Sequence, residues 1–225
     1  MTHRSIRPPQ AAARGMLALL SMTASLAALP SAAQAACPTA ETARKGFIMK
    51  TNQNLVWDVT GYEGDAANVV ETIPTTSGRG LVRRLTLDHG IVTVRIAGPD
   101  YTLTSTFDPP LQSFFPLTMG KKELFKMVRR LDAKPDVIAR LKMKPEVPGT
   151  TVMGVTTSST LRVGDCSYDT IQIVRGIRFD DAPQFTIAQL YSPDLRMTLN
   201  VVQSQPNPGK EPTRSATTFT SIVSK

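Results

Sequence analysis

The chain has 225 residues, of which 41% are hydrophobic and 20% charged, and this is enough material for one well-packed domain. Its 26 Lys and Arg residues outnumber its 18 Asp and Glu residues, which gives a formal net charge of +8 at pH 7. After residue 35, no uninterrupted apolar run approaches the roughly 20 residues that a membrane-spanning helix needs. A transmembrane segment in the mature chain is therefore excluded.

The first 35 residues have the three-part pattern of a Sec-type signal peptide. A positive n-region contains Arg4, Arg7 and Arg14. A small, apolar h-region follows over residues 15–29, and Ala33-Gln34-Ala35 forms a small-x-small cleavage site. We expect cleavage after Ala35 and a periplasmic or secreted mature protein of residues 36–225. Removing three arginines leaves 23 basic against 18 acidic residues.

Both cysteines, Cys37 and Cys166, belong to the mature chain. Disulfides persist in exported proteins, so we predict a Cys37–Cys166 bridge. Closing a loop of about 130 residues contributes roughly 4–5 kcal/mol in the chain-entropy model, less any strain. The competing interpretation is lipidation of Cys37, which is less favoured because Gln34 stands where an aliphatic residue is normally required.

Short runs with alternating apolar and polar residues, separated by Gly, Pro and Asp, follow from residue 46 onward. The expected strands are Gly46–Lys50, Leu55–Thr60, Asn68–Ile73, Leu81–Leu87, Ile91–Ala97, Tyr101–Phe107, Lys121–Arg130, Thr151–Val163, Ser167–Phe179, Phe185–Tyr191, Leu195–Gln203 and Ala216–Val223. We predict one all-β domain, mainly antiparallel, built as a curled sheet, half-barrel or sandwich, with at most one short helix.

Two segments of this domain are harder to assign. Residues Pro135–Lys144 fit a helix with Pro135 in the first position, and they fit an alternating strand equally well; we lean to strand. The Pro- and Gly-rich residues near 204–213 are expected to form a flexible loop.

Several short motifs resemble a large group of exported, uncharacterised bacterial proteins. The matching residues are Thr106–Leu111, Phe115–Leu117, Gly120-Lys121, Gly164, Tyr168–Thr170, Ile173 and the box Tyr191-Ser192-Pro193-Asp194-Leu195. The sequence departs from the group's pattern at Leu190 and at Glu123–Phe125, where aromatic residues are common. The resemblance implies a β-rich exported domain of unknown function, and such curled sheets are similar to the half-barrels of periplasmic lipoprotein carriers.

Enzyme signatures are largely missing, and we expect no enzyme activity, cofactor or metal. His89 is the only histidine of the mature chain, which excludes multi-histidine metal sites. It stands in the expected hairpin connection Asp88-His89-Gly90, where a solvated turn residue is the favoured interpretation. The adjacent carboxylates Asp180 and Asp181 would point to opposite faces of a strand, so a solvated turn is favoured over a hydrolase pair.

Basic residues gather in one stretch of the chain. They are Lys121, Lys122, Lys126, Arg129, Arg130, Lys134, Arg140, Lys142 and Lys144. Exposed together, they would attract an anionic lipid, lipopolysaccharide or cell-wall polymer, whereas export makes nucleic acid an improbable partner. The alternative is an ordinary solvated face or an edge strand guarded by lysines.

These observations favour an exported cell-envelope β domain with a non-enzymatic binding role. The alternatives are a carboxylate-dependent envelope hydrolase, which needs two carboxylates facing one cleft, and a structural or assembly subunit, which needs an exposed strand edge. The sequence does not identify a ligand, a partner or an oligomeric state.

Overall fold

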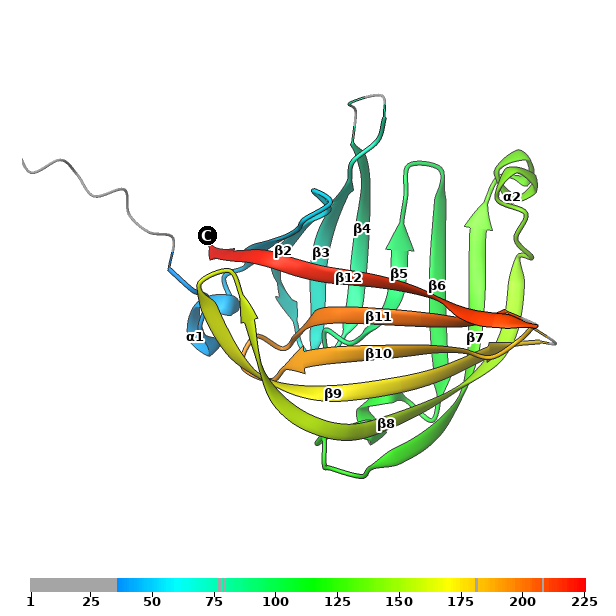
Figure 1. The fold of residues 1–225 in the computed structure, drawn as a ribbon. Helices are drawn as coiled ribbons and strands as arrows, with labels where there is room; N and C mark the ends of the chain where they lie inside the picture. The colour runs from blue at the N-terminus through cyan, green and yellow to red at the C-terminus, as the bar shows by residue number, and fades with distance from the viewer. Residues whose placement is uncertain (1–35, 77, 79, 181, 208) are drawn as a thin grey trace, which may run out of the picture. The chain divides into compact units, whose positions relative to one another are not determined.

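Twelve antiparallel strands close into a barrel in the computed structural model, in which each strand pairs with its neighbours along the chain (Figure 1). The structure describes residues 36–76, 78, 80–180, 182–207 and 209–225. The signal peptide predicted for residues 1–35 therefore lies outside the described residues. The described part of the chain belongs to one compact unit.

The barrel strands range from five to eighteen residues in length. Their bounds are β1 (Phe47–Thr51), β2 (Val56–Glu63), β3 (Ala66–Ile73), β4 (Leu81–Asp88), β5 (Val92–Ala97), β6 (Tyr101–Asp108), β7 (Lys122–Ala133), β8 (Glu146–Val163), β9 (Cys166–Phe179), β10 (Phe185–Ser192), β11 (Met197–Asn207) and β12 (Lys210–Ser224). Two short α-helices, α1 (Ala40–Ala43) and α2 (Pro135–Leu141), and the 3-10 helix η1 (Leu111–Phe114) complete the described elements.

The first and last strands close the barrel, because β1 pairs with β12 on one side and with β2 on the other. The closing register runs from Phe47 opposite Ser224 to Lys50 opposite Ser221. The predicted all-β, antiparallel fold class is confirmed. The sequence left open whether the sheet closes; in the structure it closes into a barrel, which leaves neither terminal strand with a free edge.

The up-and-down order divides the strand connections between two ends of the barrel. We call the end that carries the β1–β2, β3–β4, β5–β6, β7–β8, β9–β10 and β11–β12 connections the mouth, and the opposite end the base. Helix α2 lies in the β7–β8 connection and so belongs to the mouth (Figure 1). Helix α1 precedes β1 at the base.

Side chains alternate between the inside and the outside of the barrel, as they must on a strand. On β7, the buried Phe125, Met127 and Leu131 point inward, whereas Lys122 and Lys126 are exposed. Inward-facing residues form two hydrophobic clusters, one around Phe47, Leu199 and Phe219 and one around Phe114, Phe125 and Ile173.

Two sequence-based expectations differ from the structure. Pro135–Lys144 does not form a strand: Pro135–Leu141 is helix α2, which Pro135 begins and which ends at Lys142 in the left-handed conformation. Residues 204–213 are not mainly loop, because β11 extends to Asn207 and β12 begins at Lys210. The short β11–β12 turn lets these strands pair almost to their ends, from Asn200 opposite Thr218 to Asn207 opposite Lys210.

The structure joins Cys37 and Cys166 in a disulfide with a Cα–Cα distance of 5.6 Å. Cys166 begins β9, so the bridge attaches the segment that precedes α1 to the base of the barrel. In the described part of the chain, no helix has the length and apolar character needed to cross a membrane.

Candidate functional site

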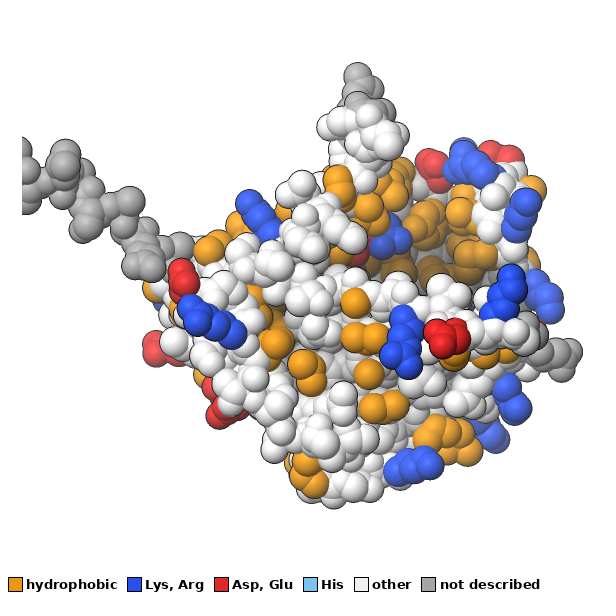
Figure 2. All heavy atoms as spheres, in the orientation of Figure 1, with side chains coloured by type: hydrophobic (Ala, Val, Ile, Leu, Met, Phe, Trp, Pro, Cys, Tyr) orange, Lys and Arg blue, Asp and Glu red, His pale blue; other side chains and the backbone are white. Residues whose placement is uncertain are grey.

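A cavity of about 330 Å³ lies inside the barrel, at the lower end of the volumes that small-molecule sites have. Apolar side chains make up much of its wall, among them Ile96, Phe107, Met127, Ile177, Phe185 and Ile187. They come from five different strands, β5, β6, β7, β9 and β10, because inward positions alternate along each strand. Figure 2 shows a hollow lined by hydrophobic side chains between the β3–β4 hairpin and the α2 end of the molecule.

Two arginines line the same cavity. Arg175 on β9 is only 8% exposed, and burial lowers the pKa of its guanidinium to about 10, with a further contribution from the charge of Arg129. Arg129 on β7 is half-buried, its pKa is also lowered by burial, and its guanidinium carbon lies 4.4 Å from the ring centroid of Phe179. Neither arginine forms an ion pair with a carboxylate among the described residues.

Three buried polar atoms on the cavity wall have no hydrogen-bond partner in the part of the chain that the structure describes. They are Nε of Arg129, Nε of Arg175 and Oγ1 of Thr151. Buried polar groups in folded proteins are nearly always paired, so three orphaned atoms around one cavity need an explanation. All three can meet an anion, because a guanidinium donates and a hydroxyl can donate.

Another inward-facing arginine, Arg83, has a carboxylate partner. Arg83 on β4 donates from Nε and Nη2 to Oε2 of Glu71 on β3, and the Nε–Oε2 distance is 2.7 Å. Trp57 on β2 donates from Nε1 to the other carboxylate oxygen of Glu71 at 2.9 Å. This charge is therefore neutralised within the protein, whereas no described carboxylate neutralises those of Arg129 and Arg175.

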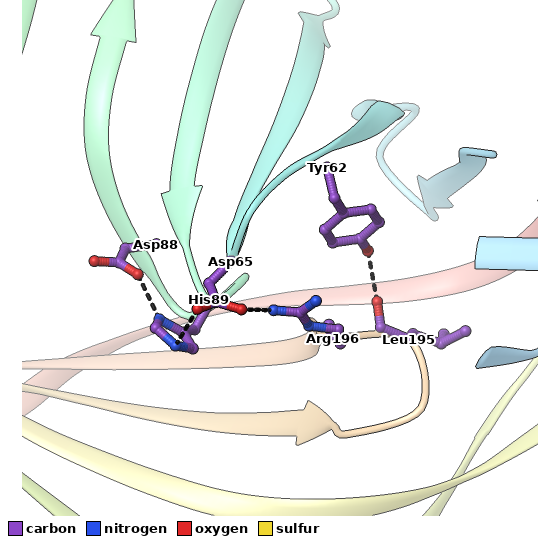
Figure 3. Close-up of polar contacts among 6 residues, drawn as sticks. All are labelled: Tyr62, Asp65, Asp88, His89, Leu195 and Arg196. Carbon is purple, nitrogen blue, oxygen red and sulfur yellow. Dashed lines mark hydrogen bonds and ion pairs between the residues drawn. The ribbon is translucent and has the colours of Figure 1, made fainter. Parts of the chain in front are cut away.

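The base of the barrel is closed by a contact between two turns (Figure 3). The β4–β5 turn reaches the β10–β11 turn, where the carbonyl of Gly90 accepts from the backbone N–H of Thr198 at 3.1 Å. Gln189 donates from Nε2 to the carbonyl of Ile91 at 2.9 Å, and Tyr62 donates to the carbonyl of Leu195 at 2.5 Å. The route into the cavity therefore runs from the mouth.

His89 is part of this closure and is not the solvated turn residue that the sequence suggested. It is 8% exposed, and its ring stacks on Phe115 with a centroid distance of 3.6 Å. Nδ1 lies 2.5 Å from Asp88 and Nε2 lies 3.6 Å from Asp65, which also pairs with Arg196 (Figure 3). Phe115, which follows η1, and the Asp65–Arg196 pair at the β10–β11 connection lie against the imidazole ring of His89 and limit its contact with solvent.

The nine basic residues singled out from the sequence do not share one surface. Arg129 lies inside the barrel, whereas Lys122, Lys126 and Arg130 lie on the outer face of β7. Four others belong to the mouth: Lys134, Arg140, Lys142 and Lys144 flank or lie on α2. Lys121 precedes β7 and donates to the carbonyl of Ser113 at 2.8 Å.

Several of these charges are already paired. Arg130 pairs with Glu146 at 2.8 Å, Arg140 with Asp100 at 3.1 Å, and Lys144 with Asp180 at 3.2 Å. Exposed ion pairs of this kind contribute little to stability, yet each one removes a positive charge from a surface that could attract anions. The mouth is therefore less basic than its lysine count suggests.

The alternation of residues along β9 could have identified Arg175 from the sequence as an inward-facing residue. Ile171, Ile173 and Ile177 share the inward face of β9, and the same period of two places Arg175 on that face. An arginine in an otherwise apolar inward series is the cue for a buried polar site. Arg129 follows the same rule between Met127 and Leu131.

The described residues around the cavity do not supply the groups that a carboxylate-dependent hydrolase or a metal site needs. Its lining residues in the described part of the chain include no carboxylate, which a glycosidase-type pair would require. Among the described residues, no group of three or more His, Cys, Asp or Glu side chains is placed to hold a metal ion. Asp180 lies in the β9–β10 turn, and Asp181 lies outside the described residues.

Comparison with known proteins finds a likeness to a solved structure but no match of sequence. No protein-family model and no curated protein matches the chain. The crystal structure of the hypothetical lipoprotein YmcC from Escherichia coli K12 is similar with a TM-score of 0.45 and 8% sequence identity, over 70% of this chain and 78% of that chain. The cavity has to be interpreted from its own geometry.

Proposed function

We propose that this protein is an exported, non-enzymatic binding protein whose barrel holds a small amphipathic molecule. One observation carries the proposal: a cavity whose wall combines apolar and polar side chains contains three buried polar atoms that have no partner among the described residues. Hydrophobic and aromatic side chains beside a few convergent polar groups are typical of small-molecule sites. The closed base and the hollow at the mouth give such a molecule one direction of entry.

Export is supported by the N-terminal sequence and by the disulfide. Residues 1–35 have the signal-peptide pattern, and a Cys37–Cys166 bridge is the kind of cross-link that persists outside the cytoplasm. We place the mature protein in the periplasm or outside the cell. Mass spectrometry of the exported protein should find Ala36 or Cys37 as its first residue, without an acyl chain.

Binding can be tested with a neutral naphthylamine dye, which fluoresces when it enters an apolar site. We expect saturable binding that decanol displaces. Ser105 on β6 lines the cavity, so Ser105→Phe should fill part of it and lower dye affinity at least tenfold. The matched control is Thr106→Phe, because Thr106 is the next residue on β6 and lies exposed on the outer face.

Both variants need a thermal melt to show that they remain folded. The proposal fails if the folded wild-type protein does not take up the dye, or if Ser105→Phe and Thr106→Phe bind it as well as the wild type does.

The outer face of β7 supports a second, separate proposal of contact with an anionic surface. Lys122 and Lys126 flank Leu124, which is 58% exposed, and neither lysine has an ion-pair partner among the described residues. Positive charges beside an exposed apolar side chain are suited to the surface of an anionic lipid layer. This contact would involve the outside of the barrel and not the cavity.

A further inference from the structure

Arg129 and Arg175 place two positive charges inside the barrel without a compensating carboxylate among the described residues. Taking a charge out of water costs free energy unless a partner compensates for it, and inside this barrel the charge of Arg83 is compensated by Glu71. Arg175 is only 8% exposed, and its Nε donor has no hydrogen-bond partner among the described residues. The second guanidinium, that of Arg129, repels the first, since the two like charges line the same cavity.

A negatively charged ligand would compensate for the burial of the two charges and for the repulsion between them. An oxyanion accepts several hydrogen bonds, and guanidinium groups match the geometry of carboxylate and phosphate oxygens. Thr151 adds a hydroxyl on the same wall, and its buried Oγ1 atom has no partner within the described ranges. Two guanidinium groups and one hydroxyl therefore converge on a site with positive charge and free donors.

The remaining wall indicates what the rest of the ligand is. Phe107, Phe185 and Ile187 present apolar surface beside the two arginines. An inorganic anion would leave this surface in contact with water, whereas an apolar chain would cover it and gain about 25 cal/mol for each Å² of apolar area buried. The cavity thus combines the requirements of a charged head group and of a hydrocarbon chain.

We propose that the cavity binds an apolar chain that ends in an oxyanion, a carboxylate or a phosphate, and that this oxyanion lies between Arg129 and Arg175. This inference rests on the proposed binding function and names the ligand class of the same site. The hydrocarbon chain packs among the apolar residues of β6 and β10. The protein thereby selects acyl or alkyl anions over neutral molecules of the same length.

The test is isothermal titration calorimetry with four probes on the purified mature protein. Decanoate and decyl phosphate carry the two possible head groups, decanol has the chain without a charge, and inorganic phosphate has a charge without a chain. We expect at least one of the two charged chains to bind ten times or more as tightly as decanol. Inorganic phosphate should bind more weakly than decyl phosphate. The better of the two charged chains identifies the head group.

Variants then assign the selectivity to the two arginines. Arg175→Met and Arg129→Met should each weaken binding of the charged chain at least tenfold and leave decanol affinity within twofold of wild type. Arg175→Lys keeps a positive charge and should recover part of the loss. The matched control is Arg130→Met, because Arg130 is the next residue on β7 and lies on the outer face with Glu146, so its removal should change neither affinity.

Two results would overturn the inference and leave the proposed function standing: decanol bound as tightly as the charged chains, or charged-chain affinity unaffected by both Arg175→Met and Arg129→Met. Binding of inorganic phosphate as tight as that of decyl phosphate would overturn the role of the chain. A different result, in which decanoate, decyl phosphate and decanol all fail to bind the folded protein, would reject the proposed function itself.

Discussion

Arg129 and Arg175 are two like charges inside one barrel, and neither has a carboxylate partner among the described residues. Burial and, to a smaller extent, the charge of Arg129 together lower the pKa of Arg175 to about 10. Below pH 10 the guanidinium is protonated in both the folded and the unfolded protein, so the cost of burying the charge is fully present. It is relieved only as the pH rises above about 10 toward the ordinary pKa of arginine, because the folded protein loses the proton first.

This cost predicts that Arg175→Met stabilises the unliganded protein at neutral pH. The pKa shift corresponds to roughly 3 kcal/mol, and methionine keeps much of the apolar stem of the side chain, so we expect a gain in the free energy of unfolding of about 1–3 kcal/mol. Urea denaturation at pH 7 measures it. Arg178→Met, three residues further along β9, is the control and should change stability by less than about 0.5 kcal/mol. A loss of stability in Arg175→Met would show that Arg175 serves the fold.

The closed base depends on the close approach of Gly90 to the β10–β11 turn. Gly90 has a φ of +68°, and a Cβ atom at this position would overlap the carbonyl oxygen of Arg196. We expect Gly90→Ala to lower the free energy of unfolding by about 3 kcal/mol or more, because backbone would have to move. Denaturant unfolding monitored by circular dichroism measures the loss.

A substitution at Gly64 distinguishes backbone strain from steric overlap as the cause of that loss. It has a similar φ of +58°, but an added Cβ would meet nothing within 4 Å. Gly64→Ala should therefore cost only the backbone strain, about 1–2 kcal/mol. Equal losses in the two variants would mean that contact between the turns contributes nothing to the closure of the base.

The strand pattern of the sequence predicted the fold class because the period of two is a local property. The inward series Phe125, Met127 and Leu131 can be recognised without knowing which strands pair. Closure could not be predicted in this way, since it depends on β1 meeting β12 across more than 170 residues, a pairing that nothing in either strand encodes alone. The helix α2 was ambiguous because Pro135–Lys144 satisfies both periods. The structure buries only Val137 of this helix, so the sequence pattern had little packing to reflect.

The candidate site was harder to find for a related physical reason. A charge run is visible in the sequence, but the side of the sheet on which each charge lies decides its role. Arg129 and Arg130 are adjacent, yet one lines the cavity and the other pairs with Glu146 outside. His89 was interpreted as solvated because the sequence shows the turn but not the residues that cover it, such as Phe115.

The disulfide between Cys37 and Cys166 should stabilise the barrel mainly by restricting the unfolded chain. The cysteines are 129 positions apart, and the chain-entropy model gives about 4–5 kcal/mol for a loop of this size, an upper figure. We expect reduction, or the double change Cys37→Ser with Cys166→Ser, to lower the melting temperature by several degrees. Calorimetry with and without reductant measures it, and the double variant should be insensitive to reductant. Two free thiols titrating in the exported protein before reduction would contradict the bridge.

The last prediction concerns the outer face of β7. If Lys122 and Lys126 contact an anionic lipid layer, the protein should associate with anionic vesicles at low ionic strength and poorly with neutral ones. Each charge near such a surface contributes about 1 kcal/mol, so Lys122→Glu with Lys126→Glu should weaken association tenfold or more. Salt should weaken it too, because screening shortens to about 8 Å near physiological ionic strength.

A second charge reversal identifies which part of the molecule makes the contact. Lys134→Glu with Lys142→Glu changes the net charge equally but acts at the mouth, on either side of α2. Vesicle co-sedimentation of both double variants should show the larger loss for the β7 pair, with melting temperatures near that of wild type because all four lysines are exposed. A larger loss for the α2 pair would place the membrane contact at the mouth, beside the entrance to the cavity. Association that is equal for neutral and anionic vesicles, and unchanged in both double variants, would show that these lysines are only solvated.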